Sequence, residues 1–132
     1  MPTLFEFSQQ IATLKKEKKF PEALSYFREN KNSFTKEQIA SNLYIISDMI
    51  SCLRHTNHLD AGFQFLSIYG IEINSDQKER ILSAYGWLLW AKYKAENGIK
   101  GHSATEEDFF DEEDEEISNQ NFNLDKSELL VN

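Results

Sequence analysis

Residues 39–53 read IASNLYIISDMISCL, and this stretch decides the fold class. Its apolar residues recur every three or four positions, at Ile39, Leu43, Ile46, Met49, Ile50 and Leu53. That spacing puts them on one face of an α-helix. Just upstream, Thr35 and Gln38 have the form of a capping box, in which each side chain binds an amide group of the first turn. The pattern predicts an amphipathic helix from Thr35 to about His55.

The same periodicity predicts four further helices, which makes the chain all-α with about five helices. A second capping box begins at Thr3, and Pro21 suits the first turn of a helix because its missing N–H has no partner there. Asn57, and then Asn74 or Ser75, are expected N-caps further along. The expected spans are 3–19, 21–30, 57–70 and 74–97. Short links between them favour an antiparallel array.

The charge divides the chain into two parts. The whole sequence of 132 residues has a net charge of −8, which disfavours nucleic acid as a partner. Residues 104–132 hold eleven acids and one lysine, whereas residues 1–103 hold eleven acids and thirteen bases. A block of like charge repels itself and stays solvated. We expect a helical domain over residues 1–100 and a disordered acidic tail over residues 101–132.

Several classes of protein are disfavoured by what the sequence lacks. A single cysteine, Cys52, excludes a disulfide framework and a zinc site built from several cysteines. No signal peptide or stretch long enough to cross a membrane is visible, so we expect a cytoplasmic protein. No phosphate-binding glycine loop occurs, and His55 and His58 have no second pair of ligands at a familiar spacing. We expect no cofactor, metal or membrane.

Two helix pairs share a pattern that resembles the tetratricopeptide repeat. A large apolar residue is followed seven positions later by a second one and six positions after that by a third. A small residue comes three positions later, and another apolar residue comes four positions after the small one. The first pair has Phe7, Leu14, Phe20, Ala23 and Phe27, and the second has Ile46, Leu53, Leu59, Gly62 and Leu66. The resemblance implies stacked helical hairpins over about residues 4–96.

Three features depart from that family. The repeat interval is 39 residues rather than 34, isoleucines replace the glycine of the first helix, and the closing proline is absent. A five-helix bundle without repeats is the alternative architecture. The segment from Arg80 to Trp87, with Lys92 to Lys94, also resembles tetratricopeptide-like domains of bacterial conflict-system proteins. That resemblance implies a scaffolding role in a defence system.

The last predicted helix is apolar around nearly its whole circumference. Its apolar and aromatic residues include Leu88, Leu89, Trp87, Trp90 and Tyr93. A helix of this kind is normally buried, so the preceding helices are expected to wrap around it. The alternatives are that the tryptophans anchor a partner or homodimer surface, and that the tail covers the helix.

One arrangement has the residue types of a ribonuclease site. Arg54 and His58 lie at a predicted helix end, as the catalytic arginine and histidine do in helical ribonucleases of the HEPN type. Such a pair would bind and polarise a phosphodiester. However, three residues separate them, and the motif requires four to six. Alternatively, the two residues cap the helix end, because cations suit the negative end of the dipole.

The remaining charged features point to a protein partner. Lysines at the end of the first predicted helix, Lys15, Lys16 and Lys19, are expected to steer an acidic ligand. In the tail, Phe109 and Phe110 stand within a run of acids and resemble a segment that docks in a basic groove.

We therefore predict a non-catalytic protein–protein interaction module, either an adaptor or a regulatory subunit. Its expected partner-binding residues are Trp87, Trp90, Tyr93, Lys15, Lys16, Lys19, Phe109 and Phe110. The alternatives are an inhibitor or antitoxin that acts through the acidic tail, and a small helical ribonuclease.

Overall fold

The computed structural model describes residues 2–98, and this part of the chain is all-helical, as the sequence predicts. Among these residues, no helix combines the length and apolar content that a membrane span requires. The predicted tail, residues 101–132, lies outside the described residues. The elements are α1 (Leu4–Lys16), α2 (Phe20–Asn30), the 3₁₀ helix η1 (Lys31–Ser33), α3 (Lys36–Ala40), α4 (Leu43–His55), α5 (Leu59–Ile68) and α6 (Glu79–Glu96).

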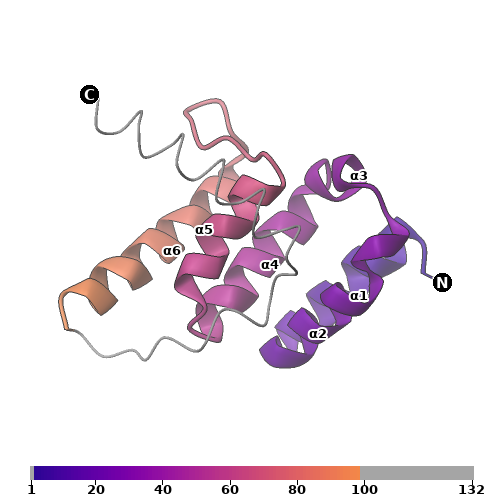
Figure 1. Ribbon diagram of the computed structural model, residues 1–132, viewed down its shortest axis with the longest axis horizontal. Coiled ribbons are helices and arrows are strands. Elements are labelled where there is room, and N and C mark those ends of the chain that lie inside the picture. Colours follow the sequence, from indigo (N-terminus) through magenta and orange to yellow (C-terminus); the bar gives the residue numbers. More distant parts are fainter. Residues whose placement is uncertain (1, 99–132) are drawn as a thin grey trace.

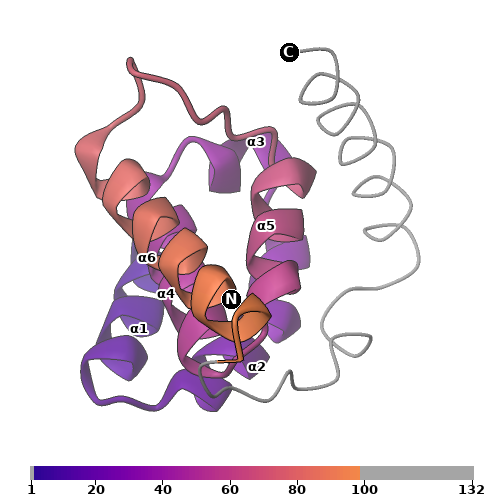
Figure 2. The same ribbon diagram turned by 90° about the vertical axis from the view of Figure 1, so that its left-hand side faces the viewer.

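Helix α4 is the centre of the fold. Figure 1 shows it between the α1–α2 hairpin on one side and α5 and α6 on the other. It contacts every other α-helix of the described residues. In the turned view of Figure 2, α6 lies nearest the viewer and covers part of α4.

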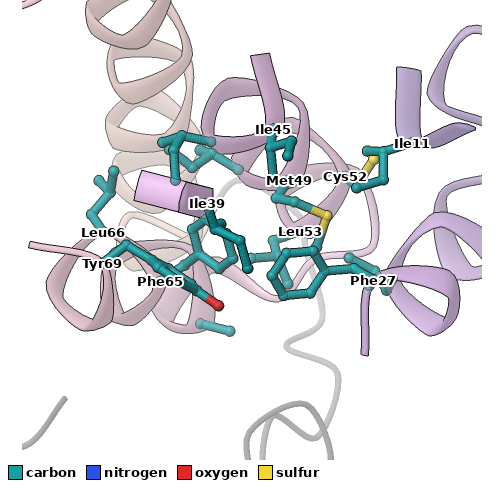
Figure 3. Close-up of a cluster of buried hydrophobic side chains, with 14 of the residues drawn as sticks. Ile11, Phe27, Ile39, Ile45, Met49, Cys52, Leu53, Phe65, Leu66 and Tyr69 are labelled. Carbon is teal, nitrogen blue, oxygen red and sulfur yellow. The ribbon is translucent and has the colours of Figure 1, made fainter. Parts of the chain in front are cut away.

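The core forms around α4 because its apolar residues face several neighbours at once. Eight of its thirteen residues are buried, among them Ile46, Met49 and Leu53. Figure 3 shows Met49 and Leu53 together with Phe27 of α2 and Phe65 of α5. Phe27 and Phe65 pack with ring centroids 5.5 Å apart. Burial of large apolar side chains of this kind contributes about 1.5–3 kcal/mol each to folding.

Both predicted capping boxes are confirmed. The Glu6 amide donates to Thr3 Oγ1 at 3.1 Å, and the Thr3 amide donates to Glu6 Oε1 at 2.9 Å. These bonds lower the pKa of the Glu6 carboxyl. Thr35 and Gln38 make the equivalent pair of bonds at 3.0 and 2.8 Å. Each box satisfies amide groups that have no partner within the helix.

The predicted helix over residues 35–55 is wrong as a single element. Asn42 divides it into α3 and α4, because its Oδ1 accepts from the amides of Tyr44 and Ile45, both at 3.1 Å. An asparagine that binds two amides of the next turn is an N-cap and starts a new helix. Including the divided segment, the described residues contain six α-helices where the sequence predicted about five.

Two predicted helix starts are also wrong. Asn57 is not an N-cap, since it has a φ of 62° and closes the turn before α5, whose N-cap is His58. Asn74 accepts from the amide of Asp76 at 2.9 Å and forms a turn within a loop. Helix α6 therefore begins later, at Glu79.

The α1–α2 and α4–α5 hairpins have equivalent turns. Lys18 and Asn57 have φ values of 60° and 62°, and the next amides bond to carbonyls five residues back, Lys19 to Leu14 and His58 to Leu53, both at 2.8 Å. This is the pattern of a Schellman motif. The equivalent positions are 39 apart, the same offset as the apolar pattern.

The small residues of the two hairpins lie at close helix contacts. Ala23 is fully buried. A Cβ atom placed on Gly62 would come within 2.9 Å of both terminal carbons of Leu88 on α6. Helix α6 therefore packs closely on α5 because position 62 has no side chain.

Candidate partner-binding groove

A groove runs across the face formed by α1, α4 and α6. Its volume is about 630 Å³. Most of the residues that line it are polar or charged, and Trp87 is the largest aromatic side chain among them. The residues that line it are Lys15, Ser47, Ser51, Arg54, His55, Glu79, Arg80, Ser83, Ala84 and Trp87. We call this surface the basic groove, because three cations from three helices reach it.

A buried carboxylate holds two of these cations. Asp48 is 1% exposed, and its Oδ1 accepts from Lys15 Nζ and from Arg80 Nη2, both at 3.0 Å. Arg80 also donates through Nε to Ser47 Oγ at 2.7 Å and lies over the Tyr44 ring at 4.8 Å. A buried charge needs such partners. Asp48 thus fixes side chains of α1 and α6 against α4 and gives the basic groove a defined shape.

The third cation, Arg54, connects α4 to α6. Its guanidinium lies 5.8 Å from the centroid of the Trp87 ring, within the range of a cation–π contact. Nη2 is also 3.1 Å from Nε2 of His55. The His55 ring stacks on Phe20 at 4.3 Å. Partial burial, together with the charges of Arg54 and nearby lysines, lowers the pKa of His55. His55 is therefore a neutral hydrogen-bonding group at neutral pH.

Among residues 2–98, the other helices do not wrap around helix α6, so the prediction that they bury it as the core is wrong. Only Ile81 and Leu88 of its eighteen residues are buried. Trp87 is 57% exposed, Trp90 49% and Tyr93 54%. The rings of Trp90 and Tyr93 stack at 5.5 Å, and Lys94 lies 5.6 Å from the Trp90 ring. These residues form an exposed aromatic ridge that leads from the end of α6 to Trp87 at the basic groove.

The structure brings together some of the predicted binding residues and separates others. Lys15 and Trp87 both line the basic groove. Lys16 and Lys19 are exposed and do not line it, and Lys19 lies 3.9 Å from Glu17. Phe109 and Phe110 lie outside the described residues.

The two residues of the ribonuclease hypothesis have different surroundings. Arg54 lines the basic groove, where its neighbour is His55. His58 lies at the start of α5, and its Nδ1 is 2.7 Å from the Thr56 hydroxyl. That hydroxyl also donates to the Leu53 carbonyl at 3.1 Å. His58 therefore belongs to the turn between α4 and α5.

The lone cysteine is a core residue. Cys52 is fully buried, and burial, reinforced by the charge of Asp48, raises the pKa of its thiol to about 12. A thiol in that state is a poor nucleophile. Within residues 2–98, no three His, Cys, Asp or Glu side chains are placed to hold one metal ion.

Sequence reasoning missed Asp48 and Arg80 as members of the site. Asp48 lies off the predicted apolar stripe of Met49, Ile50 and Leu53, so the periodicity places it among the exposed residues, although it is 1% exposed in the structure. No pattern could identify its partners, because Lys15 and Arg80 are more than thirty residues away in opposite directions.

The arrangement is suited to holding an anionic, extended ligand. Cations, serine hydroxyls and an exposed tryptophan offer ionic, hydrogen-bonding and stacking contacts in one groove.

Comparison with protein-family models, with curated proteins and with solved structures finds no match for this chain.

Proposed function

We propose that the chain is a non-catalytic interaction module that binds an acidic, aromatic-bearing segment of a partner protein in the basic groove. The observation that carries this proposal is the alignment of Lys15, Arg54 and Arg80 beside Trp87 across three helices. The cations would pair with carboxylates of the ligand, and Trp87 would stack on its aromatic residue.

A protein segment suits this surface better than a nucleic acid does. Binding of a phosphate backbone depends on many clustered cations. The basic groove has three, of which Lys15 and Arg80 are already paired with Asp48. The aromatic ridge of Trp90 and Tyr93 extends the surface, and tryptophan and tyrosine are common anchors of protein interfaces.

The repeated hairpins support a tetratricopeptide-like interpretation as part of this proposal. The two turns are equivalent, and α6 packs on α4 and α5 as the first helix of a third unit would. In that arrangement α1, α4 and α6 are the first helices of successive units, and they are the helices that line the basic groove. An adaptor or regulatory subunit in the cytoplasm, in a bacterial defence system, is the setting that the resemblances imply.

Selection from a displayed peptide library tests the proposal. The bait is the full chain, used unchanged and with Phe109 and Phe110 both replaced by serine, because residues 106–116 have the expected ligand composition. We expect enrichment of peptides in which Asp or Glu flanks an aromatic residue. Arg54→Gln should weaken the selected peptides about tenfold or more, since it removes a charge-assisted bond and the contact to Trp87.

The matched control is Arg28→Gln, which removes an exposed arginine of α2 that does not line the groove. It should leave binding unchanged. Enrichment of basic or purely apolar peptides, or equal loss in both variants, would argue against this function.

A further inference from the structure

The chain itself carries a segment with the chemistry that the basic groove would bind. Residues 106–116 read EEDFFDEEDEE, which is nine acids around the adjacent Phe109 and Phe110. We propose that this segment occupies the basic groove of its own chain and competes there with the partner. The inference rests on the proposed function, because it assigns an occupant to the same groove.

Charge complementarity favours this occupant. Three cations, Lys15, Arg54 and Arg80, reach the groove. Lys15 and Arg80 share the buried charge of Asp48, whereas Arg54 has no carboxylate partner among the described residues. Glu79 is the remaining acid of the lining and is exposed at the start of α6. Arg54 has an aromatic and a histidine as neighbours, so its charge is available to a ligand carboxylate.

The aromatic ridge offers a path from the end of α6 to the groove. Tyr93, Trp90 and Trp87 succeed one another toward the groove, and each is about half exposed. A chain that returns from Gly98 along α6 passes these rings before it reaches the cations. Stacking of Phe109 or Phe110 on Trp87 would cover an apolar surface that the described residues leave open to solvent.

The connecting length is sufficient. Trp87 lies nine residues before the end of α6 at Glu96, which is about 14 Å along the helix. The seven residues 99–105 span up to about 24 Å when extended. Residue 106 can therefore reach the level of Trp87, and the acids that follow can lie along the groove. A connection this short gives an effective concentration on the order of millimolar.

A peptide with the sequence of residues 105–117, TEEDFFDEEDEEI, labelled with fluorescein, is the probe for the test. Its binding to the full chain is measured by fluorescence polarisation at low and high salt. The comparison is with the full chain that carries Phe109→Ser and Phe110→Ser. We expect this double variant to bind the peptide at least about tenfold more tightly than the unchanged chain, because its own segment no longer competes.

Two further variants locate the occupied surface. Arg54→Gln and Arg80→Gln, each added to the double-serine variant, should weaken the peptide strongly, whereas Arg28→Gln should not. Binding should also weaken as salt rises, since the contacts are ionic. A peptide affinity that is unchanged by both groove substitutions would overturn the proposal.

The remaining outcomes separate this inference from the proposed function. Equal peptide affinity in the unchanged chain and the double-serine variant would overturn occupancy by the tail and leave the groove as a peptide site. No peptide binding to any form, at any salt, would overturn both. Analytical ultracentrifugation of the unchanged chain tests whether the segment in the groove comes from a second copy of the protein. A dimer that the double-serine change dissociates would assign the segment to the neighbouring chain and overturn self-occupancy.

Discussion

Helices α4 and α6 differ in burial although both have apolar residues through most of their length. Eight of the thirteen residues of α4 are buried, against two of the eighteen of α6. The apolar residues of α4 are mainly aliphatic, whereas those of α6 include Trp87, Trp90 and Tyr93. Indole and phenol groups keep a polar edge for water and lie beneath cations such as Arg54. The number of neighbouring helices, rather than apolar content, decides which helix is the core.

The largest expected effect on stability comes from truncating a leucine to alanine, once on α4 and once on α6. Leu53 of α4 is fully buried, whereas Leu89 of α6 is 44% exposed. Leu53→Ala should lower the free energy of unfolding by about 2–5 kcal/mol, because it leaves a cavity among packed neighbours. Leu89→Ala should change it by about 0.5 kcal/mol or less. Chemical denaturation of both variants measures the difference, and similar losses would mean that α6 is buried in solution.

A second comparison concerns the ion pairs that join α6 to its neighbours. Asp48→Asn should destabilise the protein by about 1–3 kcal/mol, since the acceptor of two hydrogen bonds from cations loses its negative charge at a buried site. Asp60→Asn affects an exposed carboxylate 3.4 Å from Lys92 and should cost about 0.5 kcal/mol or less. Thermal or urea unfolding gives both values. An equal or greater loss for Asp60→Asn would show that Asp48 does not join α1, α4 and α6 energetically.

The two helical glycines of α5 and α6 give effects of opposite sign. Gly62→Ala places a methyl group 2.9 Å from the buried Leu88 side chain and should destabilise by about 1–2 kcal/mol. Gly86→Ala meets no atom within 4 Å and should stabilise by about 0.5–1 kcal/mol through helix propensity. Urea midpoints measure both. Destabilisation by Gly86→Ala would imply that another group packs on the outer face of α6.

The smallest expected effect is a pH dependence at the basic groove. The pKa of His55 lies below its ordinary value of 6.5 in the folded protein because of burial and neighbouring cations. The unfolded chain therefore takes up a proton first as the pH falls. Stability should be unaffected above the ordinary pKa and should decrease as the pH falls below it. His55→Gln should flatten the profile as the pH falls below the ordinary pKa of 6.5. An unchanged slope would contradict this assignment.

The sequence predicted the all-helical class and the capping boxes more successfully than it predicted how the helices pack. Capping boxes such as Thr3 with Glu6 involve neighbours three residues apart, so the pattern identifies both partners. Asn42 was overlooked because the apolar stripe continues through it. The same offset that relates Leu14 to Leu53 predicted two similar hairpins, and the structure has equivalent turns there.

The basic groove could be predicted only in fragments. Lys15 and Trp87 were expected to bind a partner for separate reasons, and nothing in the spacing placed them on the same surface. Their proximity follows from the packing of α1 and α6 against α4, which is a tertiary property. Burial of α6 was predicted wrongly for the same reason, because periodicity reports the character of a helix and not its neighbours.

The central position of α4 has a consequence for the kinetics of folding. In a long linear array of repeats, units that are far apart can open and close independently of one another. Here every other α-helix of the described residues rests on α4, so none of them can complete its core before α4 is in place. Cys52, which is fully buried within α4, can therefore serve as a probe of this opening. The rate at which a maleimide labels this thiol in native buffer measures how often α4 opens, and with it how often the whole domain does.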